Sequence, residues 1–202
     1  MERIGKMNKK ILIALGSPRK NGNTACLANL VAEGARSVGA EVEIIDVGRL
    51  SNLANGCASC YGCQPGKFRC VLKDETAALI NRIPEFDVVV LATPIYFFDV
   101  SAQLKRFTDR FMALVGYEED GRVVSPLSKI QLAVIATSGS DAAESGLETI
   151  RCAMRYQSSF IGMPEVKFFH HGMCGMEQPS SLADDPVLKD QALDFGRFLS
   201  RS

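Results

Sequence analysis

The sequence has no net charge. Lys and Arg together number 23, as do Asp and Glu, in a chain of 202 residues. A protein that binds nucleic acid or an anionic membrane over a broad surface carries an excess of positive charge. The balance therefore argues against both kinds of partner, whereas a small anion needs only a local cluster of donors.

Long hydrophobic runs are also absent. No segment approaches the roughly 20 apolar residues that span a bilayer. A basic start precedes an apolar run at residues 11–15, but this run is too short for a signal peptide. With 47% hydrophobic and 23% charged residues, the composition is that of an ordinary globular protein. We therefore expect a cytoplasmic protein with no membrane segment.

The sequence lacks a linker, an internal repeat and a low-complexity tract. Its 202 residues suffice for one well-packed domain and are few for two. One long interruption of the regular pattern, at about residues 51–73, contains a cluster of cysteines. Loops of that length inside a compact domain are usually functional. We expect a single domain over residues 1–202 with a cysteine-rich insertion loop.

Apolar runs alternate with helical patterns along the chain. Runs that are apolar throughout are typical of parallel strands buried on both faces. One helical pattern begins near Asn23 and Thr24, which we interpret as a polar cap, and another recurs at 104–114. A third begins at the capping residue Asp185, which a first-turn proline follows. The alternation predicts an α/β fold with a doubly wound, five-stranded parallel sheet in the order 2-1-3-4-5 and helices on both faces. The predicted strands are 11–15, 42–47, 88–92, 132–137 and 166–169.

The loop after the first strand, residues 16–24, has the composition of a phosphate-binding site. In open α/β sheets, ligands bind beyond the carboxyl ends of the strands, and this loop leads into a helix N-terminus whose N–H groups favour an anion. The segment matches neither Gly-x-Gly-x-x-Gly nor the Walker A pattern. A solvated turn rich in capping residues is the alternative. The candidate ligand residues are Ser17, Arg19, Asn21, Asn23 and Thr24.

Two further loops are expected at the same edge of the sheet. Apolar and aromatic residues follow the third strand, where they would supply walls and backbone donors for a flavin ring. Small polar residues follow the fourth strand, near the side of the ring that accumulates negative charge on reduction. Together the three loops predict FMN as the ligand. The candidate residues are Pro94, Ile95, Tyr96 and Phe97 in one loop and Thr137, Ser138 and Gly139 in the other.

Four cysteines lie in the insertion loop as Cys57-x2-Cys60-x2-Cys63-x6-Cys70. The odd total of seven cysteines argues against a secreted disulfide framework and favours metal or redox use. Tandem x2 spacings let three thiolates converge on one cluster, and the fourth could complete it. Structural zinc usually draws on two separated Cys-x2-Cys pairs. An iron–sulfur cluster, zinc, and thiols that pack or oxidise all remain open at this point.

Residues 16–24, the cysteine loop, and the segments 93–96 and 103–110 resemble the NADPH-dependent FMN reductase and iron–sulfur flavoprotein group of flavodoxin-like proteins. The resemblance covers roughly residues 10–140 in the correct order. It implies bound FMN, reduction by a nicotinamide nucleotide or a protein donor, and a homodimer or homotetramer. It also implies that Cys57, Cys60, Cys63 and Cys70 ligate a [4Fe–4S] cluster.

Some chemically capable residues receive no role. His170, His171 and Cys174 follow the last strand without a partner motif, so we interpret them as ordinary loop residues. The charged residues of 105–110 are interpreted as a solvated, ion-paired helix face.

The sequence thus predicts an FMN-dependent NAD(P)H oxidoreductase that passes electrons to a quinone, a flavin or another small acceptor. The cofactor carries the redox chemistry, so no catalytic side chain is named. The rival prediction is an electron carrier that accepts electrons from ferredoxin through a [4Fe–4S] cluster. A flavodoxin-like module without flavin is a third, plainer possibility.

Overall fold

A computed structural model describes residues 8–64, 66–175 and 180–201. Its central sheet has the parallel strand order β2-β1-β3-β7-β8, which is the predicted order 2-1-3-4-5 when only these five strands are numbered. The strands are β1 (Lys10–Leu15), β2 (Glu41–Asp46), β3 (Val88–Tyr96), β7 (Gln131–Thr137) and β8 (Lys167–His171). The prediction of an α/β parallel sheet is confirmed.

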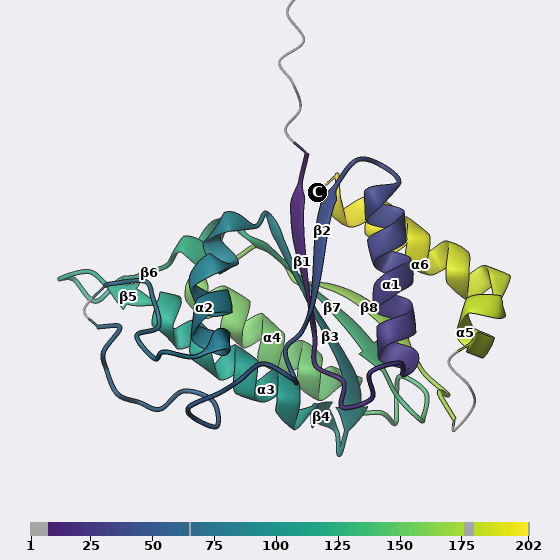
Figure 1. Cartoon of the computed structure of the whole chain (residues 1–202), viewed down its shortest axis with the longest axis horizontal. Helices are drawn as coiled ribbons and strands as arrows, with labels where there is room; N and C mark the ends of the chain where they lie inside the picture. The colour runs from purple at the N-terminus through teal and green to yellow at the C-terminus, as the bar shows by residue number, and fades with distance from the viewer. Residues whose placement is uncertain (1–7, 65, 176–179, 202) are drawn as a thin grey trace, which may run out of the picture.

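Helices cover both faces of the sheet (Figure 1). One core cluster joins the sheet to α1 and α6, and a second joins its other face to α2, α3 and α4. The apolar runs that predicted the strands are buried on both faces, as in β1, where Ile11, Leu12 and Ile13 are at most 1% exposed. The helices are α1 (Asn23–Arg36), α2 (Glu75–Arg82), α3 (Ala102–Thr108), α4 (Leu147–Ile161), α5 (Ser180–Asp184) and α6 (Pro186–Leu199).

Helices α1 and α6 pack together through two glycines. A β-carbon built at Gly34 would overlap the carbonyl oxygen of Leu193, and one built at Gly196 would overlap the carbonyl oxygen of Val31. Each glycine therefore lets the backbone of the neighbouring helix approach where any side chain would keep it away.

Two predicted boundaries are wrong. The third strand does not end at residue 92 but continues to Tyr96, because β4 (Asp99–Val100) pairs with its last residues in an antiparallel hairpin. The helical repeat at 104–114 is also not one α-helix: α3 ends at Thr108, and the 3-10 helix η2 (Asp109–Leu114) follows.

The starts of α2, α3 and α6 have capping side chains, whereas α1 and α4 begin after glycines that offer none. Asp185 accepts hydrogen bonds from the N–H groups of Val187 and Leu188, which confirms the predicted start of α6. At α1 the cap is instead Gly22, which has no side chain to offer, and Asn23 is the first helical residue. Among the described residues, no helix has the length and apolar character needed to cross a membrane.

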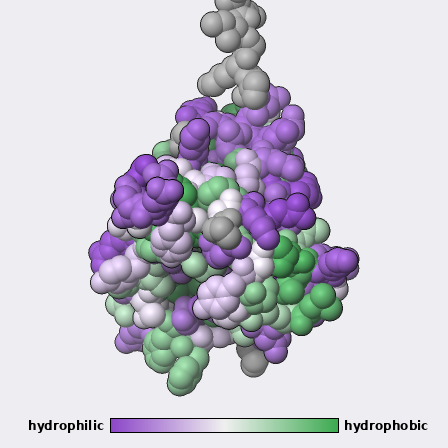
Figure 2. Space-filling model, turned by 90° about the vertical axis from the view of Figure 1, so that its left-hand side faces the viewer, coloured by the Kyte–Doolittle hydropathy of each residue, from purple (hydrophilic) through white to green (hydrophobic). Residues whose placement is uncertain are grey.

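The remaining elements are small. A two-stranded hairpin, β5 (Gly116–Tyr117) with β6 (Val123–Val124), extends from the α2 side of the sheet. Short 3-10 helices η1 (Ile83–Glu85) and η3 (Pro126–Lys129) precede β3 and β7. Figure 2 views the molecule from this side, and its upper part is mostly hydrophilic, whereas hydrophobic side chains reach the surface lower down, toward the carboxyl ends of the strands.

Candidate functional site

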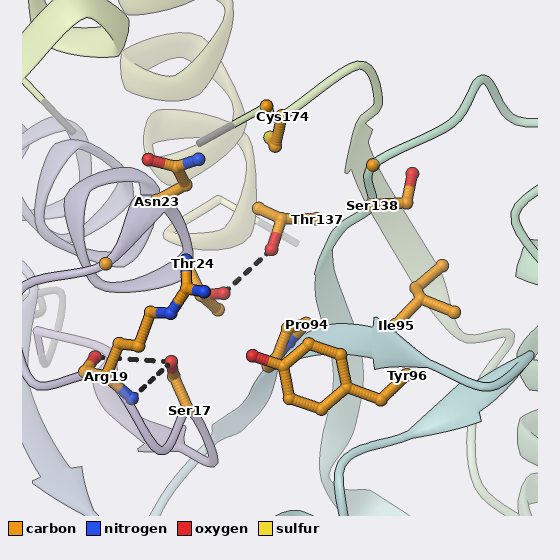
Figure 3. A pocket seen from close by; sticks show the side chains of 13 residues that line it. Ser17, Arg19, Asn23, Thr24, Pro94, Ile95, Tyr96, Thr137, Ser138 and Cys174 are labelled. Carbon is orange, nitrogen blue, oxygen red and sulfur yellow. Dashed lines mark hydrogen bonds between the residues drawn. The ribbon is translucent and has the colours of Figure 1, made fainter. Parts of the chain in front are cut away.

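The carboxyl ends of β1, β3, β7 and β8 surround a cleft at one edge of the sheet (Figure 3). Strand order reverses between β1 and β3, and open α/β sheets bind ligands at such a switch point. Four chain segments, far apart in the sequence, supply the walls. The lining residues are Ser17, Arg19, Gly22, Asn23, Thr24, Pro94, Ile95, Tyr96, Thr137, Ser138, Gly139, Cys174 and Gly175.

The loop after β1 is held in a compact turn. The Ser17 hydroxyl accepts a hydrogen bond from the Arg19 N–H and donates one to the Arg19 carbonyl, both at 3.2 Å. The N–H of Gly22 then donates to the same carbonyl at 3.2 Å. These bonds turn the chain toward the N-terminus of α1 and leave the Arg19 side chain beside the cleft (Figure 3).

The N-terminus of α1 has no capping side chain. Gly22 occupies the cap position with extended backbone angles, and the first turn contains no acidic residue. Backbone N–H groups in the first turn of a helix lack partners within the helix, and together with the helix dipole they attract an anion. A side-chain cap would satisfy one of these donors, so its absence leaves the helix end suited to an external anion.

Buried hydroxyl groups connect the cleft walls. The Thr24 and Thr137 oxygens lie 2.7 Å apart, and either can donate, so α1 is tied to the end of β7. The Ser101 hydroxyl donates to the carbonyl of Gly16, while the Ser101 N–H donates to the Thr93 hydroxyl at 3.0 Å. The start of α3 is thereby fixed to both the first loop and β3.

The hairpin between β3 and β4 turns through two phenylalanines. Tyr96 pairs with Asp99, so Phe97 and Phe98 form a two-residue turn, with φ of 49° and 68°. Such turns favour Asn and Gly, because positive φ is unfavourable for residues with bulky side chains. Tyr96 lies across the cleft in Figure 3, whereas the Phe97 side chain is 95% exposed and does not line it.

The Ser138 side chain is held in place by a hydrogen bond with His170. Its hydroxyl donates to the Ser140 carbonyl at 2.7 Å and lies 2.8 Å from Nε2 of His170. A hydroxyl has one proton, so Ser138 accepts its second hydrogen bond from an Nε2–H of His170. The Ser138 hydroxyl is therefore an acceptor toward His170, and its residue forms part of the cleft wall.

Burial lowers the pKa of His170, as do the charges of His171 and Arg151, with Asp141 acting in the opposite direction. Burial also lowers the pKa of His171, which Asp185 opposes. Each imidazole therefore takes up its proton more readily in the unfolded chain, where its pKa is near 6.5. The neutral histidines stabilise the folded state fully above the unfolded-state pKa. This stabilisation is lost as the pH falls toward the lower pKa values that the two histidines have in the folded protein.

We therefore expect the free energy of unfolding to fall between about pH 7 and pH 5, measured by urea denaturation. These two histidines are the only ones in the chain. The variant His170→Gln/His171→Gln should show a smaller fall over the same interval. An equal fall in the variant would assign the acid sensitivity to other groups.

Cys174 also lines the cleft, a role that the sequence analysis missed. Its N–H donates to the Ser138 carbonyl at 2.8 Å, which extends the pairing of β8 with β7 beyond both strands. Burial raises the pKa of its thiol, so this group is neutral at physiological pH, while a hydrogen bond with Asn23 acts in the opposite direction. The signal in the sequence is its place after the fifth parallel strand, whose carboxyl end lies at the same edge as the others.

The four loop cysteines line a second cavity, here called the cysteine cavity. The same cavity is lined by Arg110 and by apolar groups that include Val71, Leu72 and Ala113. The thiols are Cys57 and Cys60, which are exposed, and Cys63 and Cys70, which are half-buried; all are free. Burial raises the pKa of Cys63, and the charges of the other three loop cysteines add to that effect.

Arg110 lies between the cysteine cavity and a buried carboxylate. Its side chain is 1% exposed, and Nη1 lies 2.8 Å from Oδ2 of Asp74. Nη2 donates to Sγ of Cys70 at 3.0 Å. Burial opposes ionisation of Asp74, but hydrogen bonds from Arg110 and from the N–H groups of Leu53 and Ala77 keep its pKa below the usual range. The prediction of a solvated helix face at 105–110 is thus wrong for Arg110, whereas Lys105 and Asp109 do form an exposed ion pair.

The described residues present no group of three His, Cys, Asp or Glu side chains close enough to hold one metal ion. A cluster makes a different demand, because each thiolate binds its own iron atom and the sulfurs lie farther apart than the ligands of a single ion. Four thiols and one buried cation around a cavity whose other lining residues are apolar except Tyr61 fit an anionic iron–sulfur centre chemically.

The structure brings together ten of the twelve residues predicted to bind the cofactor. Asn21 and Phe97 are the two that do not line the cleft. Gly22, Cys174 and Gly175 line it in addition. The four predicted metal ligands meet at one cavity.

Comparison with known proteins agrees with this geometry. The profile of the family described as NADPH-dependent FMN reductase matches residues 9–168. An iron-sulfur flavoprotein of Methanocaldococcus jannaschii is 25% identical over 190 residues, covering 93% of this chain and 94% of that protein. An iron-sulfur flavoprotein of Archaeoglobus fulgidus is 35% identical over 99 residues, but the match covers only 48% of this chain and 43% of that protein.

Solved structures show the same fold. The NAD(P)H:quinone oxidoreductase from Methanothermobacter marburgensis matches with a TM-score of 0.70 at 18% identity, covering 96% of this chain and 95% of that one. An FMN-dependent NADH-azoreductase from Bacillus anthracis, solved in complex with FMN, matches with a TM-score of 0.66 at 15% identity, covering 96% and 99%.

Proposed function

The chain belongs to the NADPH-dependent FMN reductase family and has a flavodoxin-like fold, and on this basis we propose that it passes electrons from NADH or NADPH through FMN to a quinone, a flavin or another small acceptor. The observation that carries the proposal is the uncapped N-terminus of α1 at the switch point of the sheet, facing the cleft beside Arg19. Bound FMN would supply the redox chemistry, which leaves binding and orientation to the protein.

The first loop would hold the FMN phosphate. The dianion fits the N–H groups at the start of α1, with Arg19 as a charged donor and Ser17, Asn23 and Thr24 as neutral ones. The hydroxyl pair of Thr24 and Thr137 fixes the distance between this loop and the wall that faces the flavin ring.

The other loops would hold the ring. The end of β3 offers an apolar wall of Pro94 and Ile95 with Tyr96 across the opening. The loop after β7 offers the Ser138 oxygen, which His170 fixes as an acceptor and which therefore suits a ring N–H. Phe97 and Phe98, exposed in the turn that follows Tyr96, suit contact with a second subunit, so the proposal includes a homodimer or homotetramer.

The test is to purify the protein, extract and identify its chromophore, and follow NADH and NADPH oxidation with a quinone or free flavin as acceptor. A yellow protein that releases FMN and oxidises either nucleotide supports the proposal. A colourless protein that does not take up added FMN contradicts it.

Arg19→Met should weaken FMN binding by about tenfold to a hundredfold, because a hydrogen bond to a charged group contributes ~1.5–3 kcal/mol. Riboflavin, which lacks the phosphate, should bind the variant and the unaltered protein equally well. Flavin fluorescence titration measures both affinities.

Lys20→Met is the matched control, since this neighbouring cation is exposed and does not line the cleft. It should change neither affinity by more than about twofold. A loss of riboflavin affinity in Arg19→Met would mean that Arg19 supports the loop rather than the phosphate.

A second candidate function, electron transfer from ferredoxin through a [4Fe–4S] cluster, is favoured by the cysteine cavity. Four free thiols from one loop share this cavity with a buried cation. An anaerobic absorption spectrum with iron and sulfide analysis tests this candidate. About four irons and four sulfides per chain support it, and an iron-free protein after anaerobic reconstitution contradicts it.

A further inference from the structure

Arg110 carries a buried positive charge that the flavin site does not use. It reaches the cysteine cavity from η2, it does not line the FMN cleft, and its side chain is 1% exposed. Such a cation is costly to bury unless it is paired and hydrogen-bonded. The groups that pair with the Arg110 guanidinium therefore indicate its role.

Only two of the three guanidinium nitrogens of Arg110 have partners. One binds Asp74 and one donates to Cys70, whereas Nε is buried without a hydrogen bond. It is the only such buried side-chain atom within the described ranges 8–64, 66–175 and 180–201. A buried donor left unpaired costs ~1–3 kcal/mol, so an acceptor in the functional protein would remove a real penalty.

Cys70 is held more firmly than the exposed cysteines of the loop. Asn81 on α2 accepts from the Cys70 N–H at 2.7 Å and donates to its carbonyl at 3.1 Å. Arg110 holds the same residue through its sulfur. Asp74 completes the arrangement, because it also caps α2 through Ala77 and accepts from the Leu53 N–H at the start of the loop.

We propose that Arg110 is a positioning residue of the cysteine cavity: it fixes Cys70 as a ligand and supplies the counter-charge for an anionic iron–sulfur centre, while its unpaired Nε–H remains available as a further donor. This proposal rests on the second candidate function above. Apart from Tyr61, the remaining lining residues are apolar, including Val71 and Leu72, so their side chains would not solvate an anion. Positive charge and N–H···S hydrogen bonds both favour the reduced state of such a centre, because reduction adds negative charge.

The test measures the midpoint potential of the cluster in the full-length protein. In Arg110→Met/Asp74→Asn, both buried charges are removed and the Asn side chain can still cap α2. We expect the equilibrium constant for one-electron reduction to fall about tenfold, a shift of about 59 mV toward more negative potential. FMN content reports whether each variant is folded.

Asp74→Asn alone tests the direction in which the midpoint potential of the cluster shifts. It removes the negative charge and leaves the positive one, so the potential should move toward more positive values. Mere loosening of the loop would move the single and the double variant in the same direction. Lys73→Met removes an exposed cation next to Asp74 in the sequence. It should leave the midpoint potential unchanged, because solvent screens that charge.

The outcomes distinguish the cluster function from the role of Arg110. An unaltered protein that binds no iron overturns the cluster function and the role of Arg110 together. Iron in every variant with unchanged potentials overturns the role of Arg110 and leaves the cluster. If the double variant does not fold, Asp74→Asn decides alone: a shift toward more positive potential supports the proposal, and an unchanged or more negative potential overturns it.

Discussion

Alanine at Gly34 is expected to destabilise the protein by ~3 kcal/mol, although alanine is the better helix former. The added methyl group would overlap the carbonyl oxygen of Leu193, which is backbone and cannot turn aside. Helices α1 and α6 would have to separate, and the core cluster that joins them to the sheet would loosen. Urea denaturation followed by circular dichroism measures the loss.

Glu33→Ala is the matched control, since Glu33 is the exposed neighbour of Gly34 on the same helix. It should stay within ~0.5 kcal/mol of the unaltered protein. Gly34→Ala/Gly196→Ala should cost less than the two single changes added together, because the first methyl group already separates the helices. Strict additivity, or a Gly34→Ala variant as stable as the control, would show that the two helices do not pack this closely in solution.

Arg110→Met alone should cost ~3–5 kcal/mol, because it leaves the Asp74 carboxylate buried without its counter-charge. The Asp74 side chain is 2% exposed, so its carboxylate gains little solvation from water. The loss should shrink at low pH, where protonation neutralises the stranded carboxylate. Thermal and urea unfolding of the FMN-loaded protein measure it.

Arg110→Met/Asp74→Asn should recover most of that stability, since a neutral side chain no longer needs a cation. The comparison distinguishes an ionic role from a packing role. If the double variant is as unstable as Arg110→Met, the loss comes from the missing bulk of the arginine rather than from the unpaired charge.

The central sheet could be predicted from local patterns because buried parallel strands are apolar along their whole length. What the patterns could not show was the end of β3. Its extension to Tyr96 depends on antiparallel pairing with β4 across a turn of two phenylalanines. That turn contains none of the residues that usually mark one.

The FMN cleft was predictable because parallel strands place all their carboxyl ends at one edge. The predicted walls were the loops after three of the strands, whereas Cys174 after the fifth strand also lines the cleft. A polar cap was predicted at Asn23 or Thr24, whereas the cap is Gly22, which leaves the first-turn donors without a side-chain acceptor. A capping residue and a ligand donor are the same chemical types, so composition alone does not separate the two roles.

Arg110 shows a different limit of sequence reasoning. Neighbouring charges of opposite sign at 105–110 are typical of an exposed helix face, and Lys105 and Asp109 conform. The carboxylate that draws Arg110 inside lies 36 residues earlier in the chain. A local pattern cannot reveal such a distant partner.

The walls of the FMN cleft extend along the chain from Ser17 to Gly175 and come from both the first and the last strand of the sheet. A growing chain therefore lacks a complete cleft until β8 has been synthesised and paired with β7. FMN would bind only the finished fold, and mass action would then stabilise that fold by RT ln(1 + [L]/Kd). In a cell, the supply of flavin would accordingly influence how much of this protein survives proteolysis as well as how fast it works.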